Sequence, residues 1–262
     1  MKPPTVADWD PWFSHWTPAV RLAGYALSMT TMNAGPEPTR LRLVDGPDRH
    51  DLGGLAPGER RIIPVPDGEG GSLCVLQQAP ASWVGEGLRA RPTAAIAGWM
   101  GMCDDWVQYR RPDGAGGGVL YTGFFFNDPR TARSHSTVVQ SPKVLLGPRY
   151  ETGLILMNVS TWRGHAAAAE VSVRLHRPAG VRRTMTTIPA WAAEVLTVSQ
   201  HGDQEGHGLL IAVSRGVTVL PIGFIRDLES GALAIDHTMP PGSFHDAWGD
   251  TDRRARWAAA LV

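Results

Sequence analysis

Residues 55–65 read LAPGERRIIPV, and residues 188–198 read IPAWAAEVLTV. The two stretches align without gaps, and their apolar positions coincide, Leu55 with Ile188 and Ile63 with Leu196. A pattern that recurs within one chain is typical of repeated structural units. We therefore interpret the two stretches as the same part of two similar β-units.

The segments around the two stretches follow the same order. Upstream of each lies a strand in which apolar and polar residues alternate, at 40–44 and at 170–175, as expected when one face of a strand is buried. Further upstream, an apolar strand ends at Asn33 in one unit and at Asn158 in the other. Asparagine side chains bind backbone groups at turns, so we expect both to cap loops.

Further short apolar runs are bounded by turn residues, which is typical of antiparallel β-proteins. They lie at 61–65, 73–76, 136–140, 143–146, 194–198, 209–213 and 217–222. The aromatic run at 119–126 also predicts a buried strand. Helix signals are confined to the small residues of 93–106 and to a short C-terminal stretch, 253–261.

These patterns predict an all-β protein. We expect two β-sandwich units of immunoglobulin-like or jelly-roll type, with a strand-rich middle segment and a short C-terminal helix. The Gly-rich stretch at 113–118 suggests a boundary, so residues 1–110 form the predicted N-terminal unit and residues 111–262 the C-terminal unit with its Pro/Gly-rich tail.

Composition narrows the classes of partner and the compartment. The chain has 25 basic and 25 acidic residues, and zero net charge argues against nucleic-acid binding. It has no N-terminal signal-like apolar region and no apolar run of transmembrane length, so we expect a soluble cytoplasmic protein without a membrane partner. Its two cysteines are interpreted as free buried thiols.

The residue types that bind metals gather in two places. Two His–Asp neighbours flank a Pro-Pro-Gly turn near the C-terminus, and a polar loop carries two more histidines. Imidazole and carboxylate groups suit a divalent ion such as Zn or Fe. The candidate ligands are Asp236, His237, His245, Asp246, His201 and His207. The alternative, which we favour for both places, is a turn or loop without a ligand, so no cofactor is expected.

Tryptophan is the third candidate. Ten tryptophans occur in 262 residues, and exposed indole rings can bind sugars or protein surfaces. The candidate ligand-binding residues are Trp9, Trp12, Trp16 and Trp248. The competing interpretation is that the N-terminal three pack against the sheets, since their spacing would also place them on one face of a short helix.

The function favoured by these observations is non-catalytic. We expect a binding or assembly protein that recognises a carbohydrate or a protein partner through loops and Trp-bearing surfaces. The standard nucleotide-binding, hydrolase and metalloprotease motifs are absent from the sequence. The alternative is a metal-dependent enzyme that activates water or polarises a carbonyl with the His/Asp residues of the C-terminal unit. A structural subunit of a homo-oligomer is the third possibility.

Overall fold

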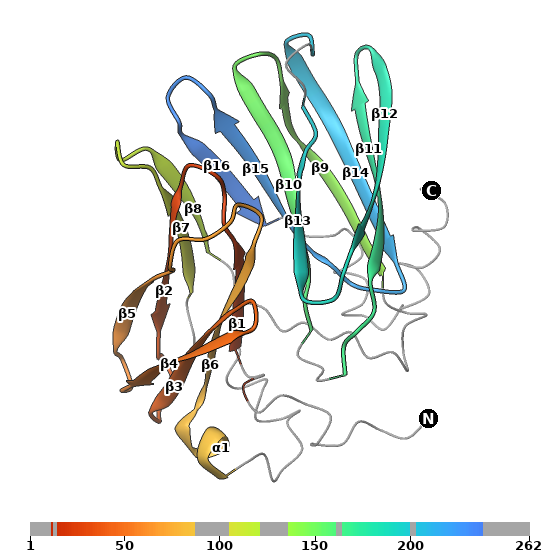
Figure 1. The fold of residues 1–262 in the computed structure, drawn as a ribbon. Coiled ribbons are helices and arrows are strands. Elements are labelled where there is room, and N and C mark those ends of the chain that lie inside the picture. Colours follow the sequence, from red (N-terminus) through yellow and green to blue (C-terminus); the bar gives the residue numbers. More distant parts are fainter. Residues whose placement is uncertain are drawn as a thin grey trace. The chain divides into compact units, whose positions relative to one another are not determined.

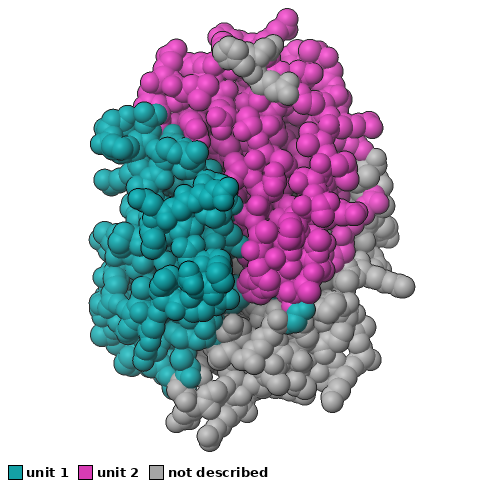
Figure 2. Space-filling model, viewed as in Figure 1, with its two compact units in different colours: residues 1–114, 118–126, 160–164 teal, residues 115–117, 127–159, 165–262 magenta. Residues whose placement is uncertain are grey.

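The computed structural model describes Trp12 and residues 15–86, 105–120, 136–160, 164–199 and 203–237 (Figure 1). The chain groups into two compact units (Figure 2). Unit 1 comprises Met1–Gly114, Gly118–Phe126 and Ser160–Gly164, and unit 2 comprises Ala115–Gly117, Asn127–Val159 and His165–Val262.

The first eight strands form two four-stranded antiparallel sheets, in the orders β1-β6-β3-β4 and β5-β2-β7-β8. The helix α1 (Ala81–Glu86) follows β6. The strands are β1 (His15–Val20), β2 (Ala26–Met32), β3 (Thr39–Asp45), β4 (Asp48–Leu55), β5 (Arg60–Pro64), β6 (Leu73–Pro80), β7 (Trp106–Arg110) and β8 (Gly116–Leu120).

The last eight strands form two further four-stranded antiparallel sheets, in the orders β12-β11-β14-β9 and β13-β10-β15-β16. The strands are β9 (Ser136–Leu146), β10 (Tyr150–Asn158), β11 (Ala169–Arg177), β12 (Gly180–Ile188), β13 (Ala192–Thr197), β14 (Gly206–Arg215), β15 (Leu220–Asp227) and β16 (Leu233–His237). The all-β prediction is thus confirmed for the described residues.

The two sets of strands have the same order when β9 takes the place of β1, β10 that of β2, and so on. The register agrees as well. Ile63 of β5 lies opposite Met29, and Leu196 of β13, with which Ile63 aligns in sequence, lies opposite Leu154. The stretches 55–65 and 188–198 therefore occupy matching places in their sheets.

Alternation along the inner strands builds the hydrophobic core. In β11 every second residue from Ala169 to Leu175 is buried, and Leu41 and Leu43 of β3 are buried in the same way. In unit 2 one hydrophobic cluster joins residues of β10 to residues of β11 and β14, which belong to different sheets. Burial of this apolar surface is the main force that holds the two sheets together.

Five strands, β1, β4, β7, β12 and β16, were not predicted as separate elements. Both β4 and β12 lie at the edge of a sheet, and most of their side chains are exposed. Their sequences are polar and lack the alternation that a half-buried strand requires, so only their pairing with β3 and β11 defines them.

Other predicted boundaries are corrected. The runs 136–140 and 143–146 form a single strand, β9. The pairing of β9 with β14 shifts in register between Gly208 and Leu210. Pro142 lies at this irregularity, where a proline can stand in a strand without breaking the ladder of hydrogen bonds. The run 217–222 is a strand only from Leu220, and Trp106 begins β7. The run 121–126, the helix at 253–261 and residues 93–104 lie outside the described residues. No helix among the described residues is long and apolar enough to cross a membrane.

A buried asparagine caps the loop after β2 and after β10, as the sequence predicts. The Asn33 Nδ2 group donates hydrogen bonds to the carbonyl oxygens of Glu37 (2.8 Å) and Leu55 (3.2 Å). The Asn158 Nδ2 group donates to Ala167 (2.9 Å) and Ile188 (3.0 Å). Leu55 and Ile188 are the residues that align in sequence, so the same bond closes both units.

We predict that Asn33→Ala lowers the free energy of unfolding by about 2 kcal/mol, because buried carbonyl groups lose their donor. Asn158→Ala should have a similar effect, measured by urea denaturation. The control is Thr187→Ala at an exposed position, which should change stability by less than about 0.5 kcal/mol. A loss for Asn33→Ala no larger than that of the control would contradict the anchoring role.

Candidate functional site

A cavity of about 530 Å³ opens at one end of unit 1. Three segments line it: residues 21–27 around the loop between β1 and β2, residues 65–70 after β5, and residues 110–112 at the end of β7. Ligand pockets usually have volumes of about 300–1,000 Å³. The size of the cavity therefore suits a small molecule.

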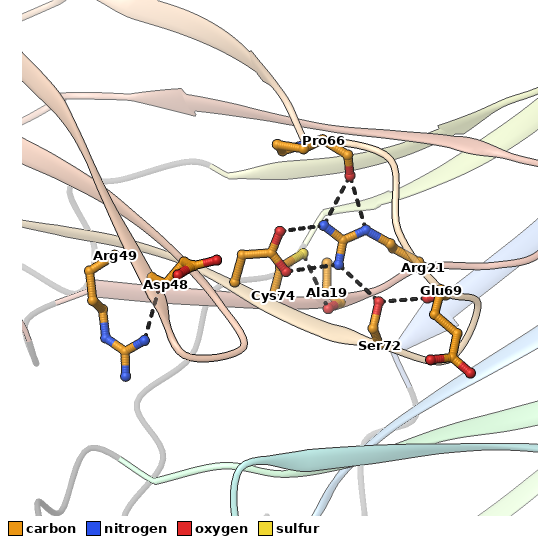
Figure 3. Close-up of polar contacts among 9 residues, drawn as sticks. Ala19, Arg21, Asp48, Arg49, Pro66, Glu69, Ser72 and Cys74 are labelled. Carbon is orange, nitrogen blue, oxygen red and sulfur yellow. Dashed lines mark hydrogen bonds and ion pairs between the residues drawn. The ribbon is translucent and has the colours of Figure 1, made fainter.

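The buried Arg21 side chain holds two of these segments in place (Figure 3). Its guanidinium group donates two hydrogen bonds to the Asp45 carboxylate (3.0 and 2.6 Å), two to the carbonyl oxygen of Pro66 (3.0 and 2.9 Å) and one to the Ser72 hydroxyl (2.9 Å). All five N–H groups are thereby used. Arg21 is therefore a rigid support of the cavity wall rather than a free ligand-binding group.

Charge and packing both fit this role. The hydrogen bond with Asp45 raises the pKa of Arg21 above its ordinary value, so the guanidinium stays charged. Gly68 passes directly over that group, and a Cβ atom at Gly68 would come within 2.9 Å of the Arg21 Nε atom. Only glycine lets the loop pass this close to the immobilised side chain.

Two further arginines lie at the cavity, at the end of β7. Arg110 is exposed and has no ion-pair partner among the described residues, whereas Arg111 contacts the exposed Asp113 carboxylate at 3.2 Å. Asp67 is also exposed and belongs to the lining segment that follows β5. Of the three arginines that line the cavity, Arg110 is thus the one without a carboxylate partner among the described residues.

Unit 2 presents a different feature, an exposed and immobilised tryptophan. Trp191 has 41% of its surface exposed, and its φ of 63° makes it the one non-glycine residue with positive φ in the described part of the chain. Its indole Nε1–H donates to the carbonyl oxygen of His165 (3.1 Å), and the two rings meet edge to face with centroids 6.1 Å apart. His165 Nε2 in turn bonds to Asn158 Oδ1 (2.8 Å).

The N-terminal tryptophans predicted as ligand contacts lie in the interior where they are described. Trp16 is 1% exposed in β1, and its Nε1–H donates to the carbonyl oxygen of Trp12 (2.6 Å). Trp12 is 8% exposed, with the Arg42 guanidinium 4.6 Å from its ring centroid. Because Trp16 belongs to a strand, the helical spacing does not describe it. Trp9 and Trp248 lie outside the described residues.

The predicted metal ligands are only partly described. His207 lies exposed on β14 and Asp236 exposed on β16, in different sheets. His201, His245 and Asp246, and the side chain of His237, lie outside the described residues. Within the described ranges, no three His, Cys, Asp or Glu residues form a group that could hold a metal ion.

One residue of the predicted polar loop between β13 and β14 has a structural role. The Asp203 carboxylate is buried between Arg177 (2.6 Å) and Arg182 (2.7 Å), and Arg182 also donates to the carbonyl oxygen of Val198 (2.7 Å). The loop is therefore anchored to the β11–β12 hairpin. A buried carboxylate held by two arginine side chains fixes the position of the chain around it.

Sequence reasoning did not single out Arg21, Arg110 or Trp191. The partners of Arg21 are distant in sequence, and the missing partner of Arg110 is visible only from strand pairing. For Trp191 a signal exists, because the gapless alignment of 55–65 with 188–198 places it on Gly58. Both residues have positive φ, 78° for Gly58 and 63° for Trp191.

Cys74 lies on β6 beside the Arg21 network, fully buried, as the interpretation of a free buried thiol requires. Burial raises the pKa of its thiol from 9.0 to about 12. We predict that the Cys103→Ser variant, which retains only Cys74, does not react with a thiol-specific disulfide reagent at pH 8. The thiolate is the reactive form, and it is both scarce and inaccessible.

Addition of denaturant should release one equivalent of reactive thiol from this variant, because the unfolded pKa lies near 9. The reaction is followed by absorbance. Rapid labelling of the folded variant at pH 8 would show that Cys74 is accessible, contrary to the structure.

No known family model and no curated protein sequence matches the chain. Among solved structures, the chain has a weak likeness to Streptomyces albus HEPD, whose structure holds 2-hydroxyethylphosphonate and Fe(II). The match has 8% identity and a TM-score of 0.13, and it covers 77% of this chain. The chain spans 63% of the length of that protein. A score this low does not indicate a common fold.

Proposed function

We propose that this chain is a non-catalytic binding protein that recognises a carbohydrate, with Trp191 as the aromatic contact surface. The observation that carries the proposal is the combination of an unfavourable backbone conformation and a fixed, exposed ring at Trp191. A protein partner bound by the same ring is the second candidate, and the experiment below distinguishes the two.

The backbone at Trp191 costs stability. The Trp191 N–H donates to the carbonyl oxygen of Asn158 (2.8 Å), and the Gly58 N–H donates to that of Asn33 (2.7 Å), so the two turns are built alike. At Gly58 a positive φ is free of strain, whereas the same conformation of an L-residue costs about 1–2 kcal/mol of stability. A bulky side chain in this region is an outlier, and such outliers often mark functional sites.

The ring at Trp191 is held ready for contact. Its polar edge is occupied by the hydrogen bond to His165, and His165 is itself buried and bonded to Asn158. The exposed part of the side chain is therefore mostly apolar ring surface. A ring that is already ordered loses little entropy on binding, and flat indole faces suit the C–H faces of sugar rings.

We also propose that each unit is a β-sandwich of immunoglobulin-like or jelly-roll type, and that the two units descend from one duplicated ancestor. Their shared strand order, register and asparagine bonds support the duplication. The core cluster that joins both sheets of unit 2 supports the sandwich. The duplication explains why Gly58 and Trp191 are comparable positions.

We predict that Trp191→Gly weakens binding to a glycan ligand at least 10-fold, while the thermal unfolding midpoint changes little. Relief of the backbone strain, about 1–2 kcal/mol, offsets the lost hydrogen bond and packing. The ligand is identified on a glycan array with the wild-type chain, and affinities follow by calorimetry. Trp106→Ala, which removes an exposed tryptophan in unit 1, is the matched control.

Two outcomes would contradict the carbohydrate proposal. One is the absence of wild-type binding across the array. The other is equal affinity of the wild type and Trp191→Gly for the glycan that binds. A partner protein whose capture depends on Trp191 but not on Trp106, with no glycan bound, would favour the second candidate.

A further inference from the structure

We infer that the cavity of unit 1 is a binding site for a small molecule that carries an oxyanion, a carboxylate or a phosphate, held by Arg110 and Arg111. The inference does not depend on Trp191, which lies in the other unit. It follows from a comparison of the same corner in the two units.

Strand register identifies the matching positions. Ala26 of β2 lies opposite Arg110 of β7, and Glu151 of β10 lies opposite Arg226 of β15. The neighbouring edge strand agrees, since Ser28 pairs with Pro64 in unit 1 and Gly153 with Thr197 in unit 2. Ala26 and Arg110 therefore take the places of Glu151 and Arg226.

In unit 2 this corner is balanced in charge. Arg226 lies 3.7 Å from the Glu151 carboxylate. Next to this pair, Arg149 from the β9–β10 turn binds the Asp227 carboxylate at 2.6 Å and lies 3.5 Å from Glu229. Each arginine thus has an acidic partner supplied by the chain.

In unit 1 two of these three acidic groups are missing, and Asp113 keeps the place of Glu229. Alanine stands where unit 2 has Glu151, and Arg111 stands where it has Asp227, while Arg110 keeps the place of Arg226. Gly24, which precedes Tyr25, takes the place of Arg149, which precedes Tyr150. Ala26 and Gly24 thus replace two large side chains of unit 2, and the loss of the glutamate also leaves Arg110 without its acidic partner.

Among the charged groups at the cavity, Arg110 is the cation that an anionic ligand could neutralise. Arg21 is neutralised by Asp45, and all its donors are used within the protein. Of the acids near the two arginines, Asp113 contacts Arg111 from the exposed side, and Asp67 lines the cavity. Guanidinium groups bind carboxylate and phosphate oxygens in pairs of parallel hydrogen bonds. A bound oxyanion would thus pair with Arg110 as the Glu151 carboxylate pairs with Arg226 in unit 2.

Calorimetric titration of the full chain at low ionic strength tests the site, with inorganic phosphate and succinate as separate probes and glucose as the uncharged control. We expect saturable binding of at least one anion and no response to glucose. Arg110→Gln should weaken that binding at least 10-fold. Arg226→Gln, which removes the matching arginine of unit 2, should leave the affinity unchanged.

The decisive variant is Ala26→Glu, which places the acid of unit 2 opposite Arg110. It should abolish anion binding without loss of thermal stability, because the matching Glu151–Arg226 pair is accommodated in unit 2. Trp191→Gly should bind the anion normally, which separates this site from the proposed function. Absence of binding for both anions, equal loss in Arg226→Gln and Arg110→Gln, or undiminished binding in Ala26→Glu would overturn the inference.

Discussion

The two-sheet arrangement of each unit depends on the hydrogen bonds made by the buried asparagine at the end of its second strand. In unit 1 the chain leaves one sheet at the end of β4 and enters the other at the start of β5. The Asn33 side chain binds the carbonyl group of Leu55 at the exit. Its backbone N–H binds Glu59, and its carbonyl group binds Gly58 at the entry. One residue thereby fixes the crossing between sheets.

The same frame in both units leaves the side chains at the rim free to differ. In unit 2 two arginine–carboxylate pairs fill one corner. In unit 1 the corresponding corner is a cavity, and the hydrogen bonds of Arg21 hold its wall in place. Because the backbone register is unchanged, these differences alter chemistry without altering the fold. Duplicated units can diverge in this way, since function resides in sites placed on a fold rather than in the fold itself.

The inner strands other than β7 could be predicted because apolar alternation or short apolar runs marked them, and the aligned stretches predicted two similar units. The edge strands β4 and β12 could not, because exposed residues carry no periodic signal. The sites were harder still. The hydrogen bonds of Arg21 join Asp45, Pro66 and Ser72, which are far apart in sequence and share no local pattern. Arg110 lacks an acidic partner because Ala26 stands where unit 2 has Glu151, and only the strand register shows that these two positions match.

Overall neutrality of charge conceals this local asymmetry. The 25 basic and 25 acidic residues cancel across the chain, which argues against a polyanion that would contact many sites at once. At physiological ionic strength, however, charges beyond about 8 Å are largely screened. A small ligand therefore responds mainly to the groups that line its cavity, where Arg110 lacks the acidic partner that Arg226 has in unit 2. Zero net charge of the whole chain is therefore compatible with an unpaired arginine at a single cavity.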